Sequence, residues 1–486
     1  MKVHARRLIP LLVALGIAIC PVPDGLASYS WYFFAIFTGC ITMLMTDAFP
    51  GAVSGLICVS LAAVLAPWVL FSPEQIASPG FKVQQQAFQW AVSGFSNSVV
   101  WMIFGAFILA RGYAVTGLGR RIALWLVKTM GHHSLSLGYA VMLADMVLAP
   151  ATPSNTARSG GILFPIIDNL PPLFDSYPNS PSRRRIGTYL MWTSLASCCV
   201  SCTLFMTAIS SNLLAVERVA HITGITIGWS EWFVAAAPAG IVMALLTPLM
   251  GYVFCRPEVK AGHEVAEWAR VELGRMGRIR REEIILTVLI VGALLLWIFG
   301  GRYIEPAMVG LAVGALMLIT GIIAWNDVLE YKAAWSTFFW FAMLIALASG
   351  LDQVGFISWF GERFGRSIQS WSPLQAVILM TVVFYVLHYF FAGATTQVIA
   401  LLPAFLAAAH FIPGIDMHFL VLMLVPTIGI MGIMTPYGTG PSPVYFGSGY
   451  IASGLGWRLG AIFGGIYLLL WMLISLPWIG WLCGAL

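Results

Sequence analysis

The sequence contains very little charge. Lys, Arg, Asp and Glu make up only 9% of its 486 residues, whereas 59% are hydrophobic and the mean hydropathy is +0.88. Such a composition excludes a water-soluble globular fold, because a soluble surface cannot hide so much apolar side chain. Runs that approach or exceed the roughly 20 residues needed to cross a bilayer occur at 31–45, 52–71, 232–255, 284–299 and 459–482. We therefore expect an all-α integral membrane protein that uses the lipid bilayer as its solvent.

Several motifs are also missing, and each absence excludes a class of function. The chain has no H-E-x-x-H metal site, no G-x-x-x-x-G-K-S/T phosphate loop and no catalytic triad or paired carboxylates within the apolar runs. The basic residues lie in short, scattered segments, which argues against a nucleic-acid partner. Most of the eight cysteines lie inside apolar runs, and the C-x-x-C at 199–202 lies among small residues typical of helix packing. We expect neither an enzyme nor a bound cofactor.

The basic segments indicate how the chain is oriented. Lys and Arg concentrate at the N-terminus, in 111–133, in 183–185 and in 256–283, and the positive-inside bias makes these segments cytoplasmic. We expect about eleven spans in a bacterial inner membrane, with a cytoplasmic N-terminus. The expected organisation is a first half at 1–255, a cytoplasmic linker with a solvated helix at 256–283 and a second half at 284–486.

Two pairs of apolar segments predict re-entrant hairpins. The runs 135–148 and 157–170 are short for a full crossing and flank a Pro- and hydroxyl-rich tip, so a hairpin at about 134–170 is expected to enter from the cytoplasm. In the second half, 374–392 and 398–411 flank residues 393–397, which predicts a hairpin at about 374–411 on the opposite side. The arms of this second hairpin are long enough that two ordinary spans remain an alternative.

Each hairpin is followed by a helix with a polar break just after a Met-Thr pair. The breaks lie at 205–212 and 433–441. The order of hairpin and broken helix occurs once per half with opposite expected orientation, which predicts an inverted repeat of the kind found in transporters. Coincidental Gly/Pro kinks in unrelated spans are the competing interpretation.

These four interruptions have the chemistry of an anion site. Half-helices that begin near Ser154, Ser210, Thr395 and Thr435 would direct positive partial charge at a common point, which suits a carboxylate. Hydroxyl and amide side chains can hold carboxylate oxygens weakly enough to release them. The polar candidates for binding the substrate are Ser154, Asn155, Thr156, Thr207, Ser210, Ser211, Asn212, Thr395, Thr396, Gln397, Thr435, Pro436 and Tyr437.

Two further candidates could carry positive charge within the apolar runs. Arg158 lies one helical turn beyond Ser154, and such intramembrane charges are costly and usually functional. It would either compensate the charge of the substrate or pair with Asp145 in the preceding arm. His388 precedes Thr395 by seven residues and could play a matching part, or it could be a buried histidine with satisfied hydrogen bonds.

Six stretches carry a resemblance to a known family: CPVPDGL from Cys20, GLGRRIALWLVKTMG from Gly117, LAPATPSNTAR from Leu148, NLPPLF from Asn169, TPYGTGPSPVYFGSGY from Thr435 and WRLGAIFG from Trp457. Here the chain resembles the divalent anion/sodium symporter family, in the branch of the bacterial citrate/succinate and tartrate/succinate antiporters. The resemblance implies an elevator-type transporter of eleven helices, usually a homodimer. It also implies that the first tip, 207–212 and 435–437 surround a small carboxylate anion and, in sodium-coupled members, sodium.

One departure from that family bears on coupling. Sodium-coupled relatives carry a second Ser-Asn-Thr where this chain has Thr395-Thr396-Gln397, so a sodium ion is expected at most near Ser154 and Asn155. Fixed cations at Arg158 and His388 could replace the charge of the ions and favour obligatory exchange. The expected function is exchange of tartrate, citrate, malate or 2-oxoglutarate for succinate. The alternatives are a sodium-coupled dicarboxylate symporter, an anion channel or a non-transporting membrane subunit.

Overall fold

The structure is a computed structural model that describes residues 2–46, 48–259, 263–301, 303–368 and 370–485. Within these ranges every regular element is a helix. Residues 260–262 of the expected linker lie outside the described residues. In the described part of the chain, eight helices are long and apolar enough to cross a membrane: Ser28–Met45, Ser98–Thr116, Ser134–Ala151, Trp229–Phe254, Arg281–Phe299, Lys332–Gln353, Pro373–Phe390 and Ser453–Cys483. Shorter apolar helices lie between them, and the expected total of eleven spans stays a prediction.

The first part of the chain leads up to the first hairpin. Its helices are α1 (Lys2–Ile19), α2 (Ser28–Met45), α3 (Gly51–Val64), α4 (Ala66–Val69), α5 (Pro73–Ala77), α6 (Val83–Val92), η1 (Ser93–Ser96), α7 (Ser98–Thr116) and α8 (Leu118–Met130). Asn97 caps α7 by accepting a hydrogen bond from the backbone N–H of Val99 at 2.9 Å. Gly117, at φ 77°, ends α7, because this left-handed conformation is open chiefly to glycine.

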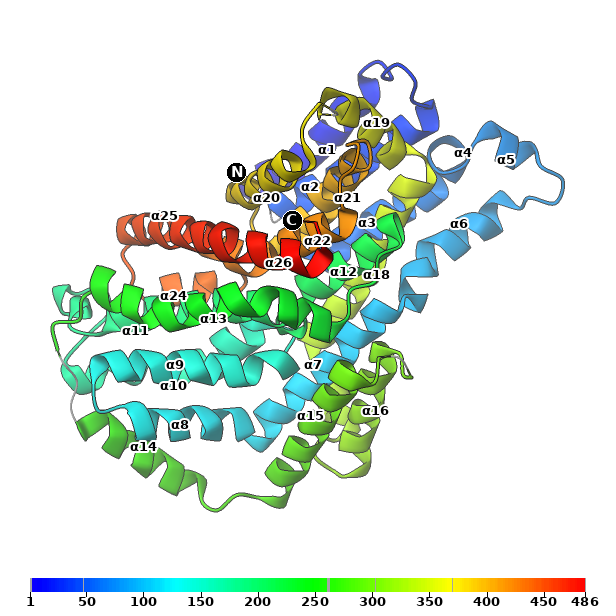
Figure 1. The fold of residues 1–486 in the computed structure, drawn as a ribbon. Coiled ribbons are helices and arrows are strands. Elements are labelled where there is room, and N and C mark those ends of the chain that lie inside the picture. Colours follow the sequence, from blue (N-terminus) through cyan, green and yellow to red (C-terminus); the bar gives the residue numbers. More distant parts are fainter. Residues whose placement is uncertain (1, 47, 260–262, 302, 369, 486) are drawn as a thin grey trace.

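The first hairpin and the first broken helix follow. Their elements are α9 (Ser134–Leu148), η2 (Ala149–Ala151), η3 (Thr156–Leu163), α10 (Phe164–Ile167), η4 (Pro171–Phe174), η5 (Pro181–Arg184), α11 (Gly187–Leu204), η6 (Met206–Ala208), α12 (Ser210–Thr223) and α13 (Trp229–Phe254). The entering arm of the hairpin, predicted to be too short for a crossing, is long enough at Ser134–Ala151, because α9 continues into a 3-10 turn. Figure 1 shows α13, α9 and α8 side by side in that order; α9 packs on α8, α11 and α13, and α10 contacts α8 and α11. Both feet of the hairpin lie at one end of the bundle, since Ser134 Oγ donates to Val259 O and Val259 N donates to Arg185 O.

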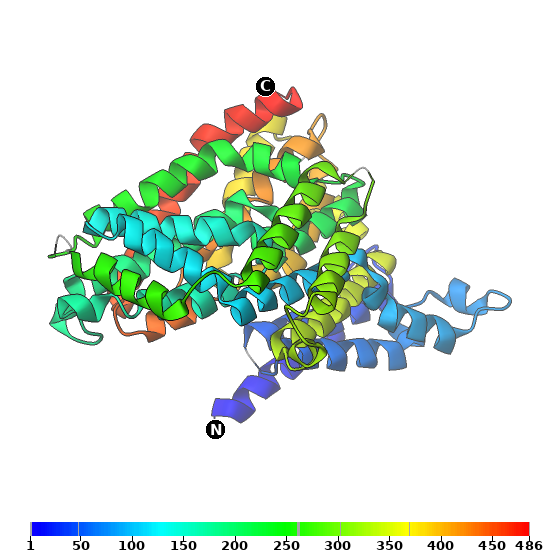
Figure 2. The ribbon, with the colours of Figure 1, turned by 90° about the horizontal axis from the view of Figure 1, so that it is seen from below.

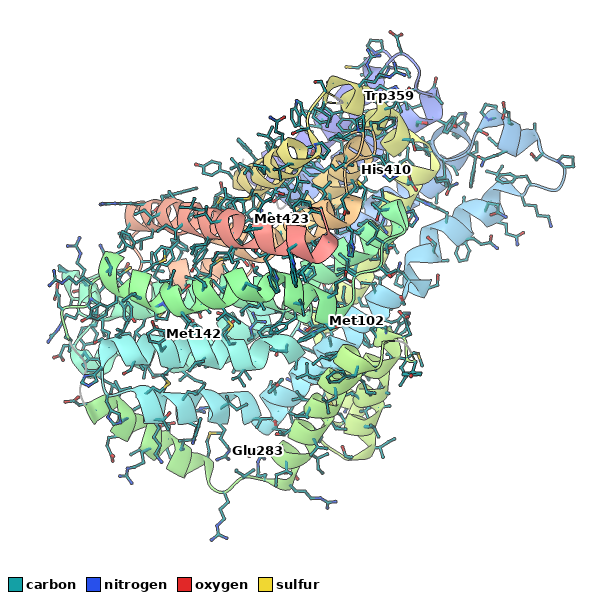
Figure 3. The ribbon with its side chains drawn as sticks, viewed as in Figure 1. Met102, Met142, Glu283, Trp359, His410 and Met423 are labelled. Carbon is teal, nitrogen blue, oxygen red and sulfur yellow. The ribbon has the colours of Figure 1, made fainter. Side chains whose placement is uncertain are left out.

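The charged segment between the halves is a packed helix rather than a loose linker. α14 (His263–Met276) lies along α8 (Figure 1) and buries Val265 and Ala269. Its other face carries the ion pair Glu267–Arg270 at 2.5 Å, as expected for a solvated helix face. Figure 3 places Glu283 at the edge of the bundle, just after α14.

The second half continues with α15 (Arg281–Phe299), α16 (Pro306–Ile319), α17 (Trp325–Leu329), α18 (Lys332–Gln353) and α19 (Phe356–Ile368). The second hairpin is α20 (Pro373–Leu387), η7 (His388–Phe390) and α21 (Ala394–Ala409). The second break is preceded by α22 (Met417–Leu424), α23 (Thr427–Ile430) and η8 (Met431–Ile433), and it is followed by α24 (Ser442–Gly447). The last helices are α25 (Ser453–Leu470), η9 (Trp471–Ser475) and α26 (Leu476–Cys483). Pro373 and Gly414 lie close together, so both feet of this hairpin also share one end.

The interior and the outer surface are both apolar, as expected for a protein in lipid. Trp232 and Trp471 are fully buried, and each indole N–H donates to a backbone carbonyl, Thr203 O at 2.9 Å and Met423 O at 2.8 Å. Val288, Phe299 and Leu473 are exposed on their helices. Hydrocarbon supplies no hydrogen bonds, so these two indoles take protein partners, while aliphatic side chains can face outward.

Candidate functional site

Residues from both hairpin tips and both helix breaks line one cavity of about 310 Å³. α7 and α18 supply the rest of its wall. The lining residues are Phe107, Ser154, Asn155, Thr156, Ile209, Ser210, Ser211, Thr337, Trp340, Phe341, Ala392, Gly393, Ala394, Thr395, Thr396, Tyr437, Thr439, Gly440 and Pro443. We call this space the central cavity.

The first tip owes its shape to its sequence. Pro150 and Pro153 interrupt α9, because proline has no backbone N–H to continue a helix. Ser154 then starts the returning arm, and its Oγ accepts a hydrogen bond from the backbone N–H of Ala157 at 3.2 Å. The arm begins as the π-helical segment η3, a geometry often found at functional sites. The result places the side chains of 154–156 in the central cavity.

The first break is held open by side chains that bond its backbone. Phe205 and Ile209 are extended, and α12 begins at Ser210. Asn212 Nδ2 donates to Cys202 O at 2.7 Å, and Thr207 Oγ1 donates to Pro150 O at 2.5 Å. Asn212 and Thr207 are buried and do not line the central cavity. These two side chains do not reach the contents of the cavity. They hold the N-terminus of α12 so that it faces the cavity.

The second tip depends on a glycine. Gly393 has φ 131°, a backbone conformation that other residues rarely adopt, and α21 begins directly after it. Gln397 is buried: its Nε2 donates to Phe384 O at 2.6 Å, and its Oε1 lies 2.6 Å from His388 Nδ1. Gln397 therefore holds the two arms of the hairpin together from behind the cavity wall.

The second break places Tyr437 and Thr439 in the cavity wall. The Tyr437 hydroxyl donates to Tyr389 O at 3.0 Å. Thr435 is buried, and Thr435 and Pro436 are not among the lining residues. The break thus presents Tyr437, Thr439 and Gly440 to the cavity and keeps Thr435 and Pro436 out of its wall.

Each tip contacts the break of the other half. Asn155 Nδ2 donates to Thr439 Oγ1 at 2.7 Å, and the hydroxyl oxygens of Ser211 and Thr395 are 2.8 Å apart. Gly440 lies so close to the first tip that an added Cβ would be 2.0 Å from Thr156 Oγ1. These contacts close the cavity between segments that are far apart in the sequence.

Arg158 is held away from the cavity. Its Nε lies 3.2 Å from Asp145 Oδ1, and its guanidinium donates to Thr152 O at 2.9 Å, Ala208 O at 2.8 Å and Ser201 Oγ at 3.0 Å. The side chain is fully buried and does not line the cavity. Of the two roles considered for Arg158, the structure therefore shows the pair with Asp145, and the guanidinium also joins the first tip to the first break.

His388 occupies a comparable place in the second hairpin. It is fully buried, and its Nε2 lies 2.8 Å from Gly438 O in the second break. Arg158 and His388 thus each connect a hairpin to a break backbone, at Ala208 O and Gly438 O respectively. Both lie behind the cavity wall rather than in it.

The central cavity has no charged side chain among its described lining residues. Its polar surface consists of hydroxyls, the Asn155 amide and the N-termini of α12 and α21, which are 14 and 16 residues long. Unpaired backbone N–H groups at such ends carry positive partial charge. The arrangement can hold a small carboxylate without a fixed ion pair.

Several lining residues gave no signal in the sequence. Phe107, Trp340 and Phe341 lie within ordinary apolar runs, where nothing local marks the face that meets the cavity. Thr439 and Gly440 lie inside the recognised break but had no feature that singled them out. The run of small and hydroxyl residues around them was the only available indication.

Comparisons with known proteins agree with this architecture. A family profile described as the sodium:sulfate symporter transmembrane region matches residues 1–485. An L-tartrate/succinate antiporter of Shigella sonnei is 51% identical over 473 residues, which are 97% of each chain, and one of Escherichia coli O157:H7 is 50% identical over the same shares.

Two solved transporter structures share the fold at low sequence identity. The YdaH transporter of Alcanivorax borkumensis has a TM-score of 0.56 at 14% identity and covers 89% of this chain and 98% of its own. MtrF of Neisseria gonorrhoeae, described as an antimetabolite efflux pump, has a TM-score of 0.56 at 13% identity and covers 91% and 96%. This likeness supports an all-helical membrane transporter architecture.

Proposed function

Because this chain belongs to the sodium:sulfate symporter transmembrane family and is a multi-pass membrane protein, we propose that it is a secondary transporter exchanging L-tartrate for succinate. The exchange takes place across a bacterial inner membrane, with the N-terminus in the cytoplasm. The relatives that match 97% of the chain at about half identity carry this activity in their names. The substrate binds in the central cavity.

The observation that carries the proposal is the convergence of four helix interruptions on one uncharged polar cavity. Irregular backbone at membrane depth is tolerated only where it is buried in protein or lines a polar space. The volume of about 310 Å³ lies at the low end of the roughly 300–1,000 Å³ typical of ligand pockets. A four-carbon dicarboxylate would contact the α12 N-terminus with one carboxylate and the α21 N-terminus with the other.

Of the candidates named from the sequence, we propose that those lining the cavity contact the substrate: Ser154, Asn155, Thr156, Ser210, Ser211, Thr395, Thr396 and Tyr437. Hydroxyl and amide groups hold a dianion weakly, and a carrier has to release its substrate. The remaining candidates are proposed as positioning residues: Arg158, Thr207, Asn212, His388, Gln397, Thr435 and Pro436.

Exchange rather than sodium-coupled uptake is supported by the cation that the protein itself supplies. The Arg158 guanidinium lies between the carbonyl oxygens of Thr152 and Ala208, oxygens that would otherwise be available to an ion. The two ring nitrogens of His388 face Gln397 Oε1 and Gly438 O, so this side chain is also occupied by protein partners. Arg158 thus occupies carbonyl oxygens that a sodium ion would need, and Asp145 balances its charge within the protein, which favours exchange without a coupled cation.

The test is counterflow of labelled succinate in proteoliposomes. Vesicles loaded with L-tartrate should take up succinate in a saturable way, at the same rate in sodium and in choline medium, and empty vesicles should take up none. Sodium-dependent uptake into empty vesicles would establish the symporter alternative. Flux without saturation and without internal substrate would indicate a channel, and absence of carboxylate transport would indicate a non-transporting subunit.

We also propose a homodimer whose subunits work by an elevator motion of the inverted repeats. The segment α4 to α6 projects away from the bundle in both views (Figures 1 and 2), and Trp68 and Phe88 are exposed on it. Two large apolar side chains exposed on a projecting segment suit contact with a second copy of the chain. Cross-linking of a Phe88→Cys variant in the membrane should give a dimer band, whereas a monomer at all cross-linker concentrations would contradict this arrangement.

A further inference from the structure

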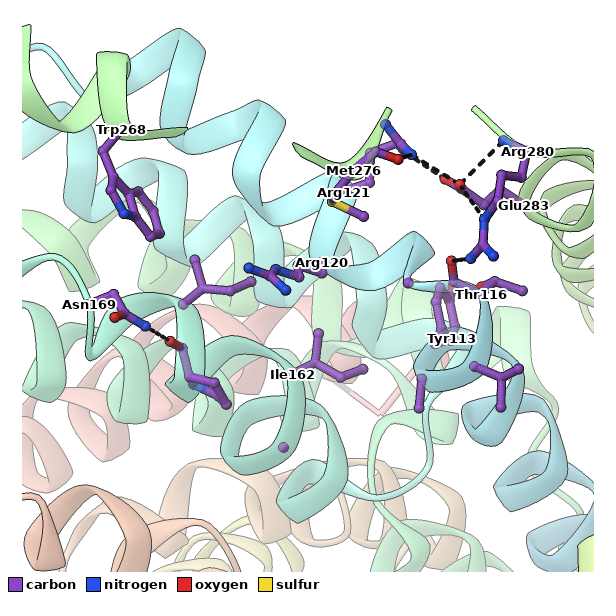
Figure 4. Close-up of a pocket in the computed structure, with 16 residues that line it drawn as sticks. Tyr113, Thr116, Arg120, Arg121, Ile162, Asn169, Trp268, Met276, Arg280 and Glu283 are labelled. Atoms are coloured by element: carbon purple, nitrogen blue, oxygen red, sulfur yellow. Dashed lines mark hydrogen bonds and ion pairs between the residues drawn. The ribbon is translucent and has the colours of Figure 1, made fainter. Parts of the chain in front are cut away.

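A second cavity of about 750 Å³ lies at the other end of the first hairpin (Figure 4). Its wall is built from the end of α7, the start of α8, the returning arm of the hairpin, α14 and the start of α15. Arg120, Arg121 and Arg280 line it, and Glu283 is the one carboxylate among its described lining residues. We call this space the arginine vestibule.

Two of the three arginines have donor groups to spare. Arg121 is committed to Glu283, with contacts of 2.5 and 3.0 Å. Arg120 Nη2 donates to Glu272 at 2.8 Å and Arg280 Nη2 donates to Thr116 O at 2.5 Å, while the two side chains remain 54% and 56% exposed. Figure 4 shows Arg120 reaching into the space between Trp268 and Tyr113. The vestibule thus presents two guanidinium groups that retain free N–H groups for an anion.

The vestibule and the central cavity share two walls. The returning arm of the hairpin places Thr156 in the central cavity and Gly161 in the vestibule. On α7, Phe107 lines the central cavity and Tyr113 lines the vestibule. Six residues of helix correspond to about 9 Å. The two spaces therefore lie along the same groove between α7 and the first hairpin.

We propose that the arginine vestibule is a second anion site, which binds the dicarboxylate weakly on the side where the first hairpin enters the membrane, before it reaches the central cavity. This inference rests on the proposed exchange of dicarboxylates. It assigns Arg120 and Arg280 to substrate capture, whereas the residues of the central cavity hold the substrate during transport.

The physical reason is electrostatic focusing. With three arginines and one glutamate in its wall, the recess has an excess of positive charge that raises the local concentration of anions, and a dianion gains twice the interaction energy of a monoanion. Because the guanidinium groups are half exposed, added salt screens them. Loss of the arginines should therefore raise KM on one side of the membrane without changing the maximal exchange rate.

The structure offers variants that remove charge without leaving a carboxylate unpaired. In an Arg120→Gln, Arg280→Gln double variant, Glu272 keeps Arg275 at 2.5 Å and Glu283 keeps Arg121 at 2.5 Å. Arg270→Gln is the control, because Arg270 lies on α14, which forms part of the vestibule wall, but its partner is Glu267 on the exposed face of that helix. An Arg120→Lys, Arg280→Lys variant retains the charge and should keep KM near the wild-type value.

The measurement compares right-side-out with inverted membrane vesicles. The double Gln variant should show a KM raised by about three- to tenfold in inverted vesicles, less at high ionic strength, and a wild-type KM in right-side-out vesicles. An unchanged KM on both sides, or an equal rise on both sides, overturns the inference while leaving the proposed function intact. Loss of exchange in the wild-type protein overturns the proposed function itself.

A second experiment distinguishes binding of a free dianion in the vestibule from binding of a lipid headgroup. In proteoliposomes of phosphatidylcholine alone, the difference in KM between wild type and the double Gln variant should persist. If that difference occurs only when anionic lipid is present, the arginines bind lipid phosphate and the inference is wrong.

Discussion

The contact between the first tip and the second break can be tested by adding one methyl group. In a Gly440→Ala variant the new carbon would lie 2.0 Å from Thr156 Oγ1, well inside any normal contact distance, so the tip must move by about 1 Å. Overpacking of this kind typically costs about 1–3 kcal/mol, which corresponds to a weakening of substrate binding by about five- to 150-fold.

A double-variant cycle identifies the cause of that loss. Thr156→Ala removes the oxygen in question, and the nearest remaining atoms are Asn155 Oδ1 at 3.3 Å and Thr156 Cβ at 3.4 Å. On this background Gly440→Ala should have little additional effect, so the two substitutions should show a coupling energy of about 1 kcal/mol or more. Gly465→Ala is the control, because an added Cβ there meets no atom within 4 Å.

The assay is KM and maximal rate of succinate/L-tartrate exchange in proteoliposomes, with the melting temperature in detergent measured alongside. Gly440→Ala should raise KM strongly and lower the melting temperature by only a few degrees, since about 1–3 kcal/mol is a small cost for a chain of this size. A wild-type KM for Gly440→Ala, or strictly additive effects of the two substitutions, would refute the contact between the first tip and the second break.

Three other predictions follow from the same geometry. Asp145→Asn leaves the buried Arg158 charge uncompensated and should lower unfolding stability by about 3–5 kcal/mol, measured as a fall in melting temperature that a second substitution, Arg158→Gln, partly reverses. Trp340→Leu enlarges the central cavity and should raise citrate exchange relative to succinate exchange in a competition assay. The pKa of Asp327 is lowered by the backbone N–H at the start of α17 and by the Arg111 guanidinium. Its contribution to stability is thus present above the ordinary aspartate pKa and lost as the pH falls through the lower folded value, so the melting temperature of Asp327→Asn should depend less on pH below about 4 than that of wild type.

The sequence by itself determined the class of fold and the places where helices are interrupted. Composition requires a lipid solvent, and Pro, Gly and hydroxyl residues at 149–156, 205–212, 393–397 and 433–441 mark where the backbone cannot continue as a helix. These are local effects: a missing N–H or a glycine conformation acts within one turn of the chain. The structure places tips and breaks in those four segments.

Only the tertiary structure decided which residues face the substrate cavity and which support it. Asn155 meets Thr439 across 284 positions of sequence, and no local pattern encodes such a pairing. The rotation of α18 about its axis turns Trp340 toward the cavity. Arg158 pairs with Asp145 because burial leaves a guanidinium no water to satisfy it. Long-range packing and desolvation set these contacts, and both depend on how the helices assemble in three dimensions.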